Sequence, residues 1–125
     1  MNLADWLFSF AISLLLAHEL DAVKHREWRL LFVLRKMEEP NAISWFIYLH
    51  LPLFLTLFWS LKSESGAAEI CQILFAAFCV VHSLLHLRLR KIGKCPFTSL
   101  SSRLLIDGAS LFAIVFLACE FVAKK

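Results

Sequence analysis

The sequence has few residues that make turns and few charged side chains. Its 125 residues include only 3 Gly and 3 Pro, and 18% are charged, against about 25% in an average soluble domain. This composition excludes a disordered chain, a disulfide-rich secreted module and an ordinary soluble enzyme. The hydrophobic fraction is 60% and the mean hydropathy is +0.72. Together these values indicate an integral membrane protein with a single domain.

Four apolar segments are long enough to cross a bilayer, which takes about 20 residues in a helix. We therefore expect an all-α integral membrane four-helix bundle with short connections, forming one transmembrane domain over the whole chain. After the first span, apolar residues alternate with basic ones, and this pattern predicts a cytoplasmic interfacial helix. The predicted spans are residues 3–22, 42–61, 67–87 and 103–122.

The basic residues indicate which side of the membrane each connection faces. Because loops rich in Lys and Arg stay in the cytoplasm, we expect both termini to lie outside it. The basic residues flank apolar spans and form no separate domain, so we expect no nucleic-acid partner. Of the 13 Lys and Arg residues, 10 lie in the first and third connections or next to them: Lys24, Arg26, Arg29, Arg35, Lys36, Arg88, Arg90, Lys91, Lys94 and Arg103.

Histidines and aspartates gather at one end of the predicted bundle. They come late in spans one and three and early in spans two and four, so alternating helix direction brings them all to the cytoplasmic third. Ionisable groups at such depth usually face the bundle interior and find partners there. These residues are His18, Asp21, His50, His82, His86 and Asp107.

Imidazole nitrogens and carboxylate oxygens on facing helices are suited to a transition metal. We expect zinc, iron or manganese, with chemistry on an apolar or lipid substrate. In this hypothesis Asp107 is a catalytic base, and His25, Glu19 and Cys95 are additional ligands or contact the ligands. The predicted metal ligands are His18, Asp21, His50, His82 and His86.

Two other interpretations of the cluster stay open. Two of the histidines could be the axial ligands of a haem in a redox module. Alternatively, the cluster is a structural polar network in a non-catalytic protein, or a relay in a small proton-conducting or ion-conducting one. A homo-oligomer or a larger membrane complex would suit this second interpretation.

The four cysteines do not form a metal-binding pattern. Cys71 and Cys119 both fall near the predicted outer ends of their spans, where a disulfide between them is geometrically allowed. Cys79 lies within the third span and is expected to be an apolar core residue.

The histidine pattern resembles that of a known group of proteins. The first span ends in His18-Glu19-Leu20-Asp21-Ala22, the second contains His50, and His82 and His86 precede a basic loop with Pro96. In this layout the chain resembles the uncharacterised small bacterial four-span membrane proteins of the HXXEE type. The present sequence has Asp21-Ala22 where that name implies Glu-Glu. The resemblance implies the four-span layout and a place in the bacterial inner membrane, and no particular activity.

Overall fold

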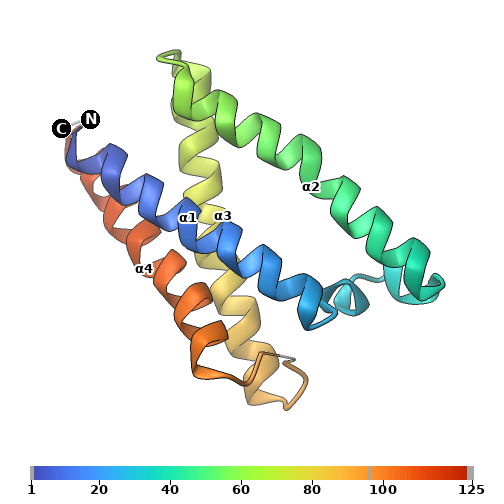
Figure 1. Cartoon of the computed structure of the whole chain (residues 1–125). Coiled ribbons are helices and arrows are strands. Elements are labelled where there is room, and N and C mark those ends of the chain that lie inside the picture. Colours follow the sequence, from blue (N-terminus) through green and yellow to red (C-terminus); the bar gives the residue numbers. More distant parts are fainter. Residues whose placement is uncertain (1, 96, 124–125) are drawn as a thin grey trace.

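The computed structural model describes residues 2–95 and 97–123, and within these ranges the chain is all-α with no strand (Figure 1). This confirms the predicted fold class. Each of the four long helices is apolar enough to cross a membrane. They are α1 (Leu3–Lys24), α2 (Glu39–Lys62), α3 (Gly66–Lys91) and α4 (Leu100–Ala123), and two short 3₁₀ helices, η1 (Glu27–Leu30) and η2 (Leu34–Lys36), lie between α1 and α2.

Local sequence signals set the helix ends. Asn2 and Asp5 form a reciprocal capping box at the start of α1, and Ser65 caps α3 through the amide of Ala68. Helix α2 begins before the predicted Ala42 because Pro40 is tolerated in a first turn, where its missing N–H has no helical partner. Gly93 follows α3 with φ of +69°, a left-handed conformation that glycine adopts without strain.

Helices α1, α3 and α4 form the compact part of the bundle, while α2 is peripheral. Figure 1 shows α1 lying along α4, and α2 meeting α3 near their connection. There the amide of Gln72 donates to the carbonyl of Ser60, and Leu57 and Phe75 join a common core with α1 and α4. Only 17% of the apolar stretch of α2 is buried, against 39% for α1. Most of α2 therefore faces outward.

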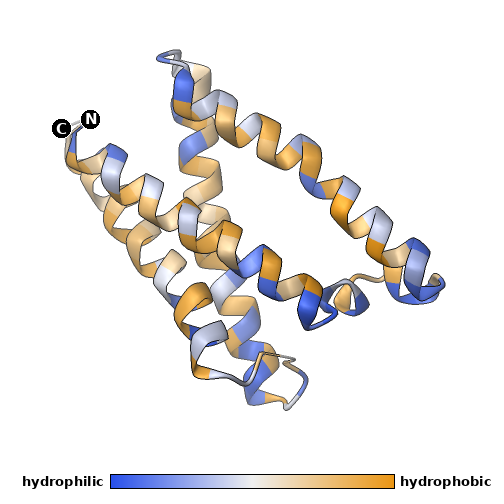
Figure 2. Cartoon of the chain, viewed as in Figure 1, coloured by the Kyte–Doolittle hydropathy of each residue, from blue (hydrophilic) through white to orange (hydrophobic). Residues whose placement is uncertain are grey.

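Between α1 and α2, where the sequence predicts an interfacial helix, the structure has two 3₁₀ turns and not a longer helix. Leu31, Phe32 and Val33 are exposed between them, and Arg35 and Lys36 lie over the ring of Phe32. Figure 2 shows hydrophilic residues gathered around this segment and the end of α3, with apolar residues along the helices. Basic groups beside exposed apolar side chains suit a membrane–water boundary.

Candidate metal centre

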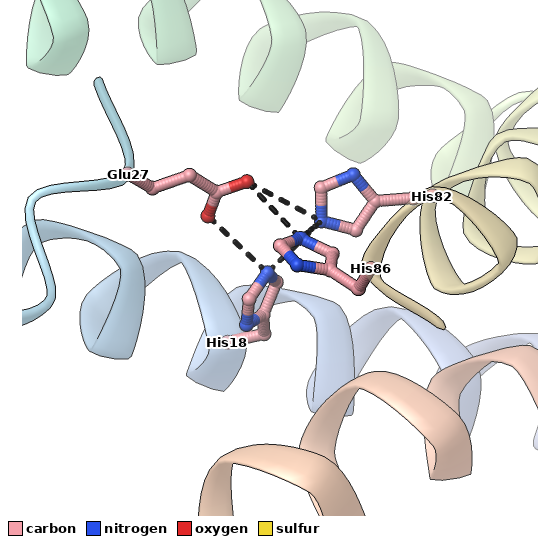
Figure 3. Close-up of side chains that lie close together, drawn as sticks. All are labelled: His18, Glu27, His82 and His86. Atoms are coloured by element: carbon pink, nitrogen blue, oxygen red, sulfur yellow. Dashed lines mark hydrogen bonds and ion pairs between the residues drawn. The ribbon is translucent and has the colours of Figure 1, made fainter. Parts of the chain in front are cut away.

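Three histidines and one glutamate converge inside the bundle (Figure 3). The Nε2 atom of His82 lies 2.9 Å from Nε2 of His18 and 3.1 Å from Nε2 of His86. The Glu27 carboxylate lies 3.2 Å from Nε2 of His86 through Oε1, and 3.5 Å from Nε2 of His18 through Oε2. One potential ligand atom from each of the four residues lies within 4.8 Å of all the others. We call these four residues the His₃Glu group.

Two helices and a loop bring the group together. His82 and His86 are one turn apart on α3, a spacing that places both side chains on the same helix face. His18 reaches them from α1 and is fully buried. The ring of Phe97, also fully buried, packs against the rings of His18 and His86 at centroid distances of 4.9 and 5.0 Å. These packed rings leave the imidazoles little rotational freedom.

Glu27 comes from η1, where an unusual backbone conformation turns the chain back toward the bundle. The preceding residue, Arg26, has φ of +56° in the left-handed region, which costs a non-glycine residue about 1 kcal/mol. The following residue, Trp28, is buried in a core with Ala22 and Phe97 and fixes η1 in place. Strain held by surrounding packing is a feature of functional sites more often than of ordinary loops.

The Glu27 carboxyl group is ionised. Its burial would by itself raise the pKa, but the side-chain contacts with His18 and His86 and the charge of the nearby imidazoles outweigh burial and lower the pKa to about 2. The group therefore presents an anionic oxygen donor beside three imidazoles at neutral pH.

Hydrogen bonds within the described residues leave part of this group unsatisfied. The buried Oε2 atom of Glu27 has no hydrogen-bond partner there, only the 3.5 Å contact with Nε2 of His18, and Nδ1 of His18 has no hydrogen-bond partner either. An unpaired buried polar atom costs roughly 1–3 kcal/mol, and more if it is charged. A cation beside Glu27 would remove that cost for the carboxylate.

The distances also suit direct coordination. Zinc binds imidazole nitrogen at about 2.0–2.1 Å, so two ligands at a tetrahedral angle lie about 3.3 Å apart. Nε2 of His82 lies 2.9 and 3.1 Å from Nε2 of His18 and His86, and Oε1 of Glu27 lies 3.2 and 3.8 Å from Nε2 of His86 and His82. These distances fall on both sides of that value, so the residues present could hold a small transition-metal ion.

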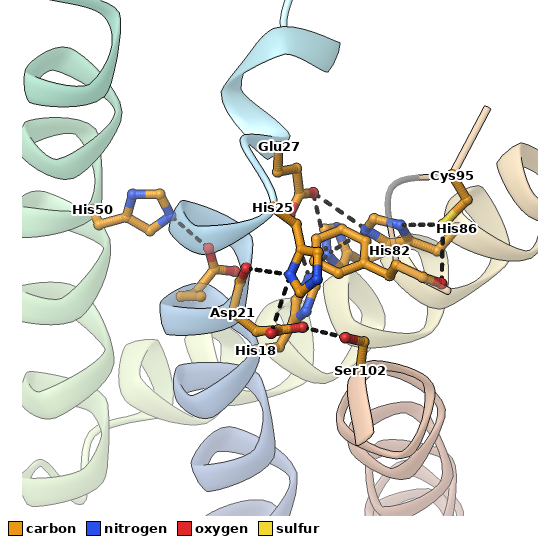
Figure 4. Close-up of polar contacts among 11 residues, drawn as sticks. His18, Asp21, His25, Glu27, His50, His82, His86, Cys95 and Ser102 are labelled. Carbon is orange, nitrogen blue, oxygen red and sulfur yellow. Dashed lines mark hydrogen bonds and ion pairs between the residues drawn. The ribbon is translucent and has the colours of Figure 1, made fainter. Parts of the chain in front are cut away.

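Of the five predicted ligands, the structure brings His18, His82 and His86 together and leaves Asp21 and His50 outside the group. Asp21 accepts a hydrogen bond from the Ser102 hydroxyl at 2.5 Å and lies 3.1 Å from Nδ1 of His25 (Figure 4). Since Ser102 is on α4 and fully buried, this contact joins α1 to α4.

His50 forms a separate pair with Glu19. Its Nε2 atom lies 2.8 Å from Oε2 of Glu19, and its Nδ1 lies 2.6 Å from the carbonyl oxygen of Phe46. The pair links α1 to α2 across a space next to the His₃Glu group.

Asp107, predicted as a catalytic base, has other partners. Both of its carboxylate oxygens accept from Arg90, at 2.8 and 3.1 Å, and Ser83 donates to it at 3.1 Å. The contacts tie α3 to α4. Cys95 contacts the group from outside, with Sγ 3.8 Å from Nδ1 of His86.

Two further observations concern residues singled out from the sequence. Cys71 and Cys119 are both free thiols, so the structure contains no disulfide between them. Glu27 was absent from the predicted ligands because it lies beyond the end of the first span. Its one visible signal is an acidic residue that lies beside a tryptophan and between two arginines, Arg26 and Arg29.

The fold and this group define the chain as a small, all-α protein with four helices able to cross a membrane and a buried His₃Glu cluster at one end. Comparison with protein families then places it: the chain belongs to the family of unknown function DUF6713, whose model matches residues 4–123. No curated protein and no solved structure matches the chain. The resemblance to HXXEE-type proteins stays a prediction.

Proposed function

We propose that the protein binds one transition-metal ion through His18, Glu27, His82 and His86. The observation that carries the proposal is the convergence of four ligand atoms, from α1, η1 and α3, within 4.8 Å of one another. Zinc, iron and manganese all accept imidazole and carboxylate ligands. A bound ion would supply Lewis acidity to an oxygen-bearing substrate or water in the membrane interior.

The geometry favours a directly bound ion over a haem. Two axial histidines lie on opposite faces of the haem iron, so their nitrogens are about 4 Å apart. Here the nitrogens of His18 and His82 are 2.9 Å apart, and a carboxylate and a third imidazole share the same space. No porphyrin plane could pass between these atoms.

The basic residues suggest where the site lies in the cell. The connection containing η1 and η2 and the end of α3 carry most of the Lys and Arg residues. By the positive-inside rule, we infer that this end of the bundle, with the metal site inside it, lies on the cytoplasmic side of the membrane, which the resemblance to HXXEE-type proteins implies is a bacterial inner membrane. Both termini would then face the opposite side.

Elemental analysis of detergent-purified protein tests the metal proposal. The wild type should contain close to one equivalent of zinc, iron or manganese, and the His18→Ala/His82→Ala variant should contain almost none. His25→Ala is the matched control, because His25 lies near the group without belonging to it, and it should retain the metal. An absorbance spectrum of the same samples tests for haem. Metal-free wild-type protein, or equal metal in all three proteins, would overturn the proposal.

A further inference from the structure

Three members of the His₃Glu group, Glu27, His82 and His86, line a cavity between α2 and α3. The cavity has a volume of about 430 Å³, within the usual range for ligand sites. Glu19 and His50 line it as well. The rest of the lining is apolar: Leu30, Leu31, Phe46, Leu49, Phe78, Leu85 and Leu89.

This cavity is accessible from the hydrocarbon of the bilayer. Leu49 on α2 and Leu85 on α3 line it and are each about half exposed. His50 comes 11 residues after Glu39, the first residue of α2, which places it about 16 Å along the helix axis. With α2 crossing the bilayer, the opening would lie at the depth of lipid tails, where an apolar molecule would reach it without passing through water.

Two polar groups contribute to the lining of the cavity: the Glu19–His50 pair and the His₃Glu group. Only the His₃Glu group has a net charge once a divalent metal is bound. Nδ1 of His50 must donate to the carbonyl oxygen of Phe46, which can only accept. The contact of Nε2 with Glu19 then requires one further proton, so the pair is either imidazolium–carboxylate or imidazole–carboxylic acid. In both forms the Glu19–His50 pair has no net charge.

A divalent ion in the His₃Glu group would be balanced by one anionic ligand, Glu27, because the three imidazoles bind it as neutral ligands. One positive charge is left facing the cavity. An uncompensated charge in an apolar surrounding is costly, so an anionic oxygen donor is favoured there.

From this arrangement we propose that the cavity binds a long-chain carboxylate, with its carboxylate at the metal beside the Glu19–His50 pair and its chain between α2 and α3. The inference rests on the proposed metal site, which supplies the positive charge. The apolar lining and the lateral opening account for the chain, and the residual charge accounts for the carboxylate.

Photo-crosslinking with a diazirine-labelled fatty acid tests this inference on full-length protein in phosphatidylcholine nanodiscs. Labelled peptides should come from the cavity-lining parts of α2 and α3. Leu85→Trp, which fills the cavity, should lower the labelling of these peptides. Leu84→Trp is the matched control, because Leu84 is a similarly exposed neighbour that does not line the cavity, and it should label like the wild type.

Two further samples test whether labelling depends on charge: the methyl ester of the same probe, which has no carboxylate, and metal-stripped protein. Loss of one charge-assisted contact, about 1.5 kcal/mol, should reduce specific labelling about tenfold in either case. Equal labelling by acid and ester, or equal labelling of the two Trp variants, would overturn the inference.

Metal content measured on the same samples separates the two proposals. Metal-loaded protein without localised labelling contradicts only the ligand inference, whereas metal-free wild type contradicts the metal site. Localised labelling that does not respond to metal stripping also overturns the inference as stated.

Discussion

His18 on α1 and His82 on α3 are 64 residues apart in the sequence, yet their Nε2 atoms lie 2.9 Å apart. Two neutral imidazoles can share one hydrogen bond in this way. Here, however, Nε2 of His86 and the carboxylate of Glu27 meet at the same place. Four ligand atoms around one point are the arrangement that a zinc ion requires.

Replacing the carboxylate of Glu27 should weaken metal binding without moving the three histidines apart. Glu27→Gln keeps the shape of the side chain and removes its negative charge, so we expect metal affinity to fall by at least about tenfold. Competition with a chelator of known affinity measures this. Glu38→Gln, which alters an exposed carboxylate outside the group, should leave the affinity unchanged. Equal affinities in both variants would exclude Glu27 as a ligand.

Removing the metal should lower the stability of the folded protein. A ligand that binds only the folded state stabilises it by about 2.7 kcal/mol at a concentration 100 times its Kd. We therefore expect chelation to lower the unfolding temperature measured in detergent and re-addition of metal to restore it. The His18→Ala/His82→Ala variant should show no response to either treatment. A wild-type unfolding temperature that chelator and metal leave unchanged would argue against the site.

The pH dependence of metal binding should not come from Glu27. Metal binding requires deprotonated imidazoles, so affinity should fall on acidification. Glu27, whose pKa is lowered from 4.5 to about 2 in the folded state, stays ionised until the pH approaches that value. Glu27→Gln should therefore weaken binding while leaving the fall on mild acidification in place. A variant whose affinity no longer fell with pH would show that Glu27 is the group that titrates.

In the metal-free protein, the same lowered pKa affects stability at acid pH. Because the folded pKa lies below the unfolded one, the contribution of ionised Glu27 is fully present above pH 4.5 and is lost as the pH falls toward 2. The shift corresponds to at most about 3 kcal/mol. Unfolding measured against pH should show this loss in the wild type and much less of it in Glu27→Gln.

The spans were predictable from the sequence, and so was much of the cluster. Long apolar runs identify α1 to α4 because a bilayer demands them, and alternating helix direction brings His18 near His82 and His86. The positions of the other residues depend on packing that no periodicity reveals. His50 lies apart because α2 runs at a distance from α1 instead of packing against it (Figure 1), and Asp21 contacts Ser102 instead.

Glu27 shows the limit of sequence patterns most clearly. A residue beyond a helix end has no helical spacing to relate it to His18. Its position depends on the left-handed conformation of Arg26 and on the burial of Trp28. Neither property could be deduced from composition or spacing, because both arise from the contact of the loop with the assembled helices.

Asp107 should prove structural. Its carboxylate pairs with Arg90 and Ser83 and is about half exposed, so Asp107→Asn should cost no more than about 1 kcal/mol. We expect a small decrease in unfolding temperature and unchanged metal content. Loss of bound metal in this variant would instead place Asp107 in the metal site.

X-ray absorption spectroscopy at the edge of the bound metal tests the central claim most directly. Our account predicts a first shell of nitrogen and oxygen near 2.0–2.1 Å, with outer-shell scattering from three imidazoles supplied by His18, His82 and His86. A sulfur ligand in the first shell, or scattering from fewer than two imidazoles, would contradict it.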